Sequence, residues 1–105
     1  MAKFLVLYRS SMSAAEQMAQ GSPETAAAGM DAWMAWAQRA GDAVVDLGAP
    51  LSTVAGSDDT TSLVGGFSIL QAASATAVMA LLDGHPHTEM GGTIQVLEFL
   101  SMPGM

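Results

Sequence analysis

The sequence predicts an α+β domain, and three observations lead to this expectation. Short apolar segments typical of strands alternate with two longer segments of helical spacing, in the order strand, helix, strand, strand, helix, strand. The chain has 105 residues, which is room for one domain, so residues 1–105 are taken as a single unit. Half of the residues are apolar and only 12% are charged, which is typical of a folded chain.

Four segments have the composition of strands, and the first carries the strongest signal. Within Lys3–Arg9, the residues from Phe4 to Tyr8 are apolar without a break. A strand with one face in water would alternate, so this pattern indicates burial on both faces. The other predicted strands are Ala43–Leu51, Leu63–Gln71 and Thr93–Leu100.

The first long helix is predicted over Pro23–Arg39. Ser22 is a suitable N-cap, Pro23 suits the first helical position, and Gly41 is a suitable stop. Helical spacing places an apolar stripe on this helix at Met30, Trp33, Met34 and Ala37. A shorter helix is expected to begin earlier, at the Ser-x-x-Glu capping box that starts at Ser13.

The second main helix is predicted over Ala73–Asp83. Its inward side chains are expected to be Val78, Met79, Leu81 and Leu82. Gly84 and Pro86 follow in the order that ends a helix, so the segment 85–89 is expected to be a loop.

This order of elements predicts a ferredoxin-like βαββαβ plait. Two right-handed crossovers over one four-stranded antiparallel sheet place both helices on the same face. The third strand then directs Phe67 and Ile69 to one face and Ser68 to the other. The open face has too few polar residues to stay in water, so we expect two copies to pair as a dimeric α/β barrel.

Charge and cysteine content exclude several function classes. The net charge is −7 with three cations in all, so nucleic acid and anionic membranes would be repelled, and neither is expected as a partner. Without cysteine there is no disulfide, thiol catalysis or Cys-based zinc site. The N-terminal apolar run is too short for an export signal, which favours a cytoplasmic location.

Several short motifs together resemble the YCII-related family. They are the opening strand, Ser22-Pro23-Glu24, Trp33-Met34-Ala35-Trp36, Gly48-Ala49-Pro50-Leu51, Gly65 to Leu70, His85-Pro86-His87 and Gly91 to Val96. The resemblance spans nearly the whole chain. It implies a ferredoxin-like fold that pairs into a dimeric α/β barrel.

Some members of that family are lyase-like enzymes with a His–Asp pair on the first strand's end and the first long helix. Here Arg9-Ser10-Ser11 follows the strand, and the helix Pro23–Arg39 contains no histidine. The resemblance therefore does not carry that catalytic pair over to this chain.

The plait brings polar residues to one end of the sheet. His85 and His87 are the only histidines, and histidine exchanges protons near neutral pH. With Glu89 they form His-x-His-x-Glu, which either holds a metal or is a loop in which an imidazole caps backbone groups. We expect no metal and no cofactor, because second-shell support is not evident.

Three further residues are candidates for binding. Arg9 is expected beside His87, where it either attracts an anionic ligand or pairs with Asp58, Asp59 or Glu89. Ser68 lies beside Gly66, where the space is a ligand cavity or close packing. Trp36 is expected to border a pocket, whereas Trp33 is expected in the core.

The resulting hypothesis is a homodimer that binds a small anionic or aromatic metabolite near Arg9 and His87. A second hypothesis is a cofactorless lyase-like enzyme with His87 as general acid or base and Arg9 steadying negative charge. A third is an accessory subunit without a ligand.

Overall fold

The strands form one antiparallel sheet in the computed structural model, which describes residues 1–13, 16–17, 19, 21–56 and 62–101. The strands are β1 (Ala2–Ser10), β2 (Val44–Asp46), β3 (Leu63–Ala72) and β4 (Thr93–Glu98). Their spatial order is β2-β3-β1-β4, with every neighbouring pair antiparallel. This is the order of the ferredoxin-like plait, so the predicted fold class is confirmed.

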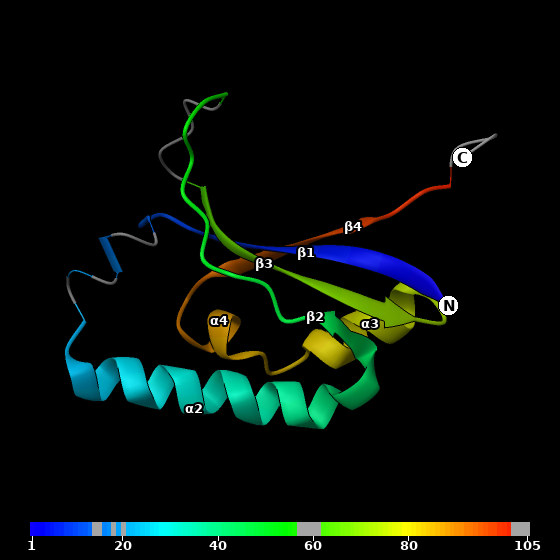
Figure 1. The fold of residues 1–105 in the computed structure, drawn as a ribbon, viewed down its shortest axis with the longest axis horizontal. Helices are drawn as coiled ribbons and strands as arrows, with labels where there is room; N and C mark the ends of the chain where they lie inside the picture. Colours follow the sequence, from blue (N-terminus) through cyan, green and yellow to red (C-terminus); the bar gives the residue numbers. More distant parts are fainter. Residues whose placement is uncertain (14–15, 18, 20, 57–61, 102–105) are drawn as a thin grey trace.

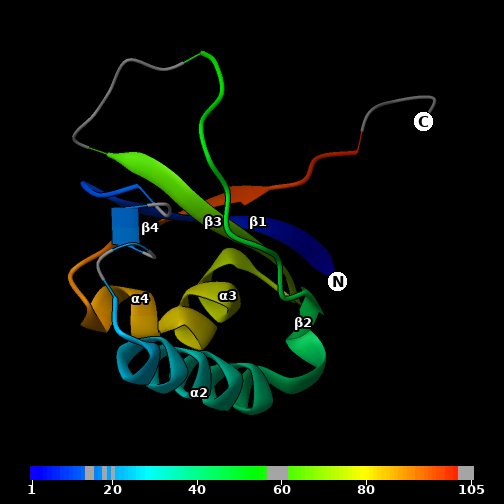
Figure 2. The same cartoon turned by 60° about the vertical axis from the view of Figure 1, so that its left-hand side comes forward.

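The helices α2 (Pro23–Ala40), α3 (Ala75–Leu82) and α4 (Pro86–Glu89) cover one face of this sheet. They lie together below the sheet in Figure 1, and the same arrangement is seen from a second direction in Figure 2. Within the described residues, no helix is both long enough and apolar enough to cross a membrane.

Strand register decides which side chains face the helices. In β1, Phe4, Val6 and Tyr8 are buried on the helix side, where Leu70 of β3 joins them in the core. The side chains between them point to the opposite face because strand side chains alternate. The core therefore lies between the sheet and α2, α3 and α4.

The long helix α2 begins at the predicted residue and ends one residue later than predicted, at Ala40, and its buried face differs in part from the prediction. The Ser22 hydroxyl accepts from the Thr25 N–H, and Gly41 ends the helix at a φ of 59°. Trp36 is buried, whereas Met30 and Met34 are 62% and 42% exposed. The helix is rotated so that the Trp36 indole N–H reaches the Leu81 carbonyl at 2.9 Å.

The second strand is shorter than Ala43–Leu51 because the chain turns after Asp46. The Asp46 carboxylate accepts from the Gly48 N–H at 2.8 Å, and Gly48 has a φ of 91°. A Cβ at Gly48 would lie 1.6 Å from the Phe67 carbonyl oxygen, so only glycine fits there. Pairing resumes as a single bridge between Pro50 and Gly66.

The segment after α3 is a helix and not the loop that was predicted. Pro86 occupies the first turn of α4, and His85 is its N-cap. Gly84, with a φ of 72°, ends one helix, and Pro86 starts the next because proline also suits a first helical position.

Helix α3 also departs from the prediction in two respects. It begins at Ala75 and not at Ala73, because the Ser74 hydroxyl accepts from the Ala77 N–H and caps it. Met79 is 57% exposed and does not pack inward.

The expected short helix after Ser13 lies partly outside the described residues. Its capping contact is present, since the Glu16 N–H donates to the Ser13 hydroxyl at 3.1 Å. The last predicted strand ends at Glu98 and not at Leu100, although the Phe99 N–H still donates to the Lys3 carbonyl.

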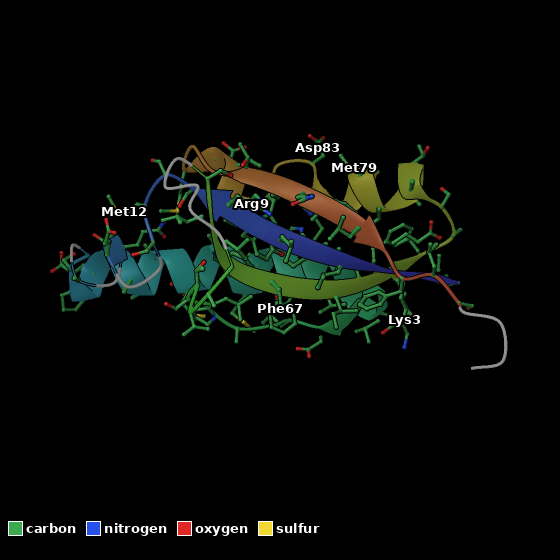
Figure 3. All side chains as sticks on the ribbon, turned by 90° about the horizontal axis from the view of Figure 1, so that it is seen from above. Lys3, Arg9, Met12, Phe67, Met79 and Asp83 are labelled. Atoms are coloured by element: carbon green, nitrogen blue, oxygen red, sulfur yellow. The ribbon has the colours of Figure 1, made fainter. Side chains whose placement is uncertain are left out.

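The face of the sheet opposite the helices is apolar. Leu5 of β1 lies between Ile69 of β3 and Leu97 of β4, and Leu7 lies beside Phe67. These side chains are half-buried or exposed, and Figure 3 shows this face from above with no helix over it. We therefore propose that a second copy of the chain covers this face.

Leu97→Glu tests this proposal, because it places a charge on the open face at a position that is already 42% exposed. We expect wild type to be a dimer at micromolar concentration by light scattering, and Leu97→Glu to shift toward monomer. Met79→Glu is the matched control on the outer side of α3, and it should stay dimeric. A wild-type monomer, or equal behaviour of the two variants, would contradict the proposal.

Candidate functional site

An aromatic cluster lies under one end of the sheet on the helix side. It is formed by Tyr8 of β1, Trp33 and Trp36 of α2, and the two histidines His85 and His87. His85 is its centre: its ring stacks on Tyr8 at 5.0 Å and meets the two indoles edge-on at 4.5 and 4.4 Å. Three elements distant in sequence are joined by these rings.

The His85 imidazole is held in one tautomer and has an unpaired donor. Its Nδ1 accepts from the His87 backbone N–H at 3.0 Å, so the ring proton is on Nε2. The side chain has no exposed surface, and within the described part of the chain Nε2 has no hydrogen-bond partner. A buried polar group without a partner is rare and is destabilising.

The surroundings of His85 also keep it neutral. Burial lowers its pKa to about 4, and electrostatic interactions with the His87 and Arg39 side chains act in the same direction. At neutral pH the imidazole is therefore a hydrogen-bond donor through Nε2 and not a cation.

His87 is fixed by a different contact. Its Nε2 lies 2.8 Å from the Arg9 carbonyl oxygen, which can only accept, so Nε2 donates. The ring packs closely on Gly92, where a Cβ would lie 2.2 Å from Nε2. In the neutral ring, Nδ1 then carries the free lone pair and is the basic nitrogen.

The structure brings the Arg9 backbone to His87 but not the Arg9 side chain. The guanidinium lies on the open face, where Nε donates to the Gln95 side chain at 2.8 Å and a second nitrogen donates to the Ser62 carbonyl at 3.3 Å. Figure 3 shows Arg9 on this face. Its expected alternative partners Asp58 and Asp59 lie outside the described residues.

Ser68 is buried in a satisfied hydrogen-bond chain. The Tyr8 hydroxyl donates to Ser68 Oγ at 2.9 Å, and Ser68 donates to the Leu47 carbonyl at 2.6 Å. Burial raises the pKa of Tyr8 to about 12, partly offset by the bond to Ser68, so the phenol stays protonated. Beside it, a Cβ on Gly66 would lie 3.2 Å from the Ala49 carbonyl, which indicates close packing at this point.

The residues His85, His87 and Glu89 do not converge on one point. One nitrogen of each histidine is engaged with the backbone. Across the described ranges, no group of three or more metal-binding side chains is found. The expectation that the protein retains no metal remains a prediction.

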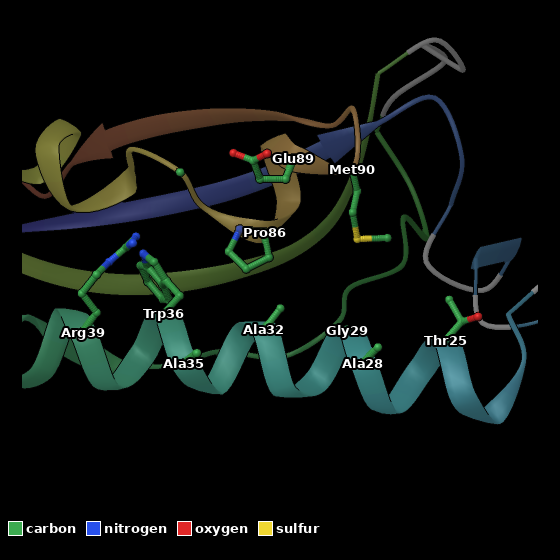
Figure 4. Close-up of a pocket in the computed structure, with 11 residues that line it drawn as sticks. Thr25, Ala28, Gly29, Ala32, Ala35, Trp36, Arg39, Pro86, Glu89 and Met90 are labelled. Atoms are coloured by element: carbon green, nitrogen blue, oxygen red, sulfur yellow. The ribbon is translucent and has the colours of Figure 1, made fainter.

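A groove of about 680 Å³ opens between α2 and α4, next to the aromatic cluster (Figure 4). Trp36 lines this groove and also touches His85. It is the more deeply buried of the two tryptophans, since Trp33, which was expected in the core, is only half-buried against it. Glu89 lies on the opposite wall. The other residues along it are Thr25, Ala28, Gly29, Ala32, Ala35, Arg39, Gly84, Pro86 and Met90.

Sequence reasoning missed Tyr8 and Arg39. The apolar pattern places Tyr8 in a buried strand. Its hydroxyl is the signal that indicates a further role, since a buried phenol normally finds a hydrogen-bond partner. Arg39 is three residues after Trp36, and this spacing places the two on one helix face.

The chain is thus an α+β domain of the ferredoxin-like type with an aromatic cluster and a groove at one end of the sheet. Among solved structures it is similar to 5-chloro-2-hydroxyhydroquinone dehydrochlorinase (TftG) from Burkholderia phenoliruptrix AC1100, in complex with 2,5-dihydroxybenzoquinone. The two are 24% identical over 93% of each chain, with a TM-score of 0.56, which shows a shared fold. No protein-family model matches, and no curated protein matches.

The lowered pKa of His85 predicts a loss of stability in mild acid. The unfolded chain takes up a proton at an ordinary pKa of about 6.5, whereas the folded chain resists it down to about 4. The free energy of unfolding is therefore unaffected by protonation of His85 above pH ~6.5. It falls by on the order of 3 kcal/mol as the pH drops from about 6.5 to about 4.

Chemical denaturation between pH 6.5 and 5, above the range of ordinary carboxyl groups, measures about half of this loss. His85→Asn keeps a capping oxygen but does not titrate, so its stability should change less over this interval. Equal slopes for wild type and His85→Asn would show that His85 does not titrate as described.

Proposed function

We propose that the protein is a YCII-like small-molecule-binding protein whose ligand is a planar, oxygen-bearing ring. The observation that carries the proposal is the unpaired, fully buried Nε2–H of His85 inside an aromatic cluster. Such a donor is satisfied by an acceptor atom that the described part of the chain does not supply. A ligand carbonyl, phenolate or carboxylate oxygen supplies one.

The aromatic walls agree with a planar ligand. Tyr8 and the two indoles offer ring faces and edges within 5.0 Å of the imidazole. Aromatic pairs of this kind contribute about 0.5–1.5 kcal/mol beyond burial. Trp36 touches both the groove and His85, so a ring compound in the groove lies next to the cluster that holds Nε2.

The similar solved structure supports the same ligand class. TftG was solved with 2,5-dihydroxybenzoquinone, a flat ring with several acceptor oxygens. The shared fold makes compounds of this class the natural first probes for this chain.

A lyase-like enzyme without a cofactor is the second candidate, and the orientation of His87 favours it. The bond from Nε2 to the Arg9 carbonyl leaves Nδ1 as a positioned base, which is the arrangement that general base catalysis needs. Arg9 serves this arrangement through its carbonyl oxygen.

Ligand binding by wild type and His85→Phe tests the first proposal. Phenylalanine keeps a ring against Tyr8 but has no N–H, so we expect the affinity for benzoquinones and hydroxybenzoates to fall about 10-fold. Isothermal titration calorimetry measures this, with melting temperatures as a control for the lost cap on the His87 N–H. Unchanged affinity in a folded variant, or no binding by wild type, would overturn the proposal.

His87→Gln separates the binder from the enzyme. The glutamine amide can still donate to the Arg9 carbonyl but cannot act as a base, so fold and ligand affinity should be retained. If the protein is an enzyme, turnover of a bound compound should fall ~100-fold or more. Turnover that survives in His87→Gln would remove His87 as the base, and no turnover by wild type would leave binding as the function.

A further inference from the structure

The groove between α2 and α4 has opposite charges on its two walls. Arg39 projects from α2 beside Trp36, and Glu89 belongs to α4 on the other side (Figure 4). No ion pair between these two side chains is present in the described part of the chain. The groove therefore offers one cation and one carboxylate that do not neutralise each other directly.

Arg39 has donors to spare. One guanidinium nitrogen donates to the Asp83 carbonyl at 3.0 Å, which holds the side chain at the groove. A guanidinium has five N–H donors, and its fork matches a carboxylate. The charge of Arg39 also acts on the buried His85, because it contributes to the lowered pKa of that imidazole.

The middle of the groove is shaped for a flat apolar body. The small side chains of Ala32 and Ala35 leave space along the α2 side of the groove. Trp36 and Pro86 add larger apolar surfaces. Ligand sites combine such walls with a few polar groups at defined positions. His85, the buried side chain with an unpaired donor, lies directly behind Trp36.

We infer that this groove binds a small ring compound with a single carboxylate for Arg39 and a hydroxyl or amino donor, placed away from it, for Glu89. The inference rests on the proposed function and names its ligand class and subsite. Glu89 disfavours a phosphate dianion, since like charges repel, whereas its carboxylate accepts a hydrogen bond from a hydroxyl. The overall charge of −7 likewise disfavours polyanions.

Four probes that differ in one group each test the ligand class: 4-hydroxybenzoate, benzoate, phenol and cyclohexanecarboxylate. We expect 4-hydroxybenzoate to bind wild type most tightly by isothermal titration calorimetry. Benzoate lacks the donor for Glu89, phenol lacks the carboxylate, and cyclohexanecarboxylate lacks the flat ring. Equal affinity for all four would overturn the inference.

Charge variants locate the site. Arg39→Gln should weaken 4-hydroxybenzoate binding ~10-fold or more, and Glu89→Gln should abolish the preference for 4-hydroxybenzoate over benzoate. Lys3→Gln and Glu98→Gln are matched controls that remove the same charges away from the groove, and they should bind as wild type does. Melting temperatures confirm that each variant is folded.

The outcomes separate this inference from the proposal beneath it. If Arg39→Gln and Glu89→Gln bind like wild type while His85→Phe is weakened, the protein binds rings but not through these two charges, and the inference fails alone. If wild type binds none of the ring compounds, both fail. An effect of Lys3→Gln equal to that of Arg39→Gln would show a general charge effect and would also overturn the inference.

Discussion

The burial of His85 is the constraint on which this end of the molecule depends. Its ring fills the space between Tyr8 of β1 and the two tryptophans of α2, and its Nδ1 caps α4. Sheet, long helix and short helix therefore meet at one side chain. The arrangement has an energetic consequence, because a fully buried imidazole must stay neutral and its second nitrogen has no partner within the described residues. An apolar ring would fill the same space without an unpaired donor, but it would lose the cap on the His87 N–H.

The side chains of the two histidines make different contacts, although the residues are only two positions apart. His85 turns inward among aromatic rings, whereas His87 turns toward the end of β1 and binds a backbone carbonyl. The proline between them makes this division, since Pro86 starts α4 and fixes the direction of the chain. One imidazole is thus available as a buried donor and the other as an oriented base, and the two proposed functions correspond to these two roles.

Several residues of the candidate site can be predicted from the sequence. The histidines, Trp36 and Glu89 were identified from their residue types and from the plait, and they do lie at one end of the sheet. Arg9 was placed correctly along the strand, but its side chain points to the open face, because side chains at odd positions of β1 face away from the helices. The sequence pattern does not single out Arg39, because a cation in the last turn of a helix usually interacts with the helix dipole.

The order of the strands and main helices, and hence the plait, follows from local patterns in the sequence, whereas α4 and the end of β2 do not. Apolar runs, a Ser-Pro start and glycine stops act over a few residues, and few topologies accommodate that order of elements. Long-range packing sets which side of α2 is buried, where β2 stops and what surrounds His85. Trp36 reaches the Leu81 carbonyl, and His87 reaches the Arg9 carbonyl, across 45 and 78 positions of the chain. Contacts between residues so far apart in the sequence depend on how whole elements pack, so local spacing along the chain does not predict them.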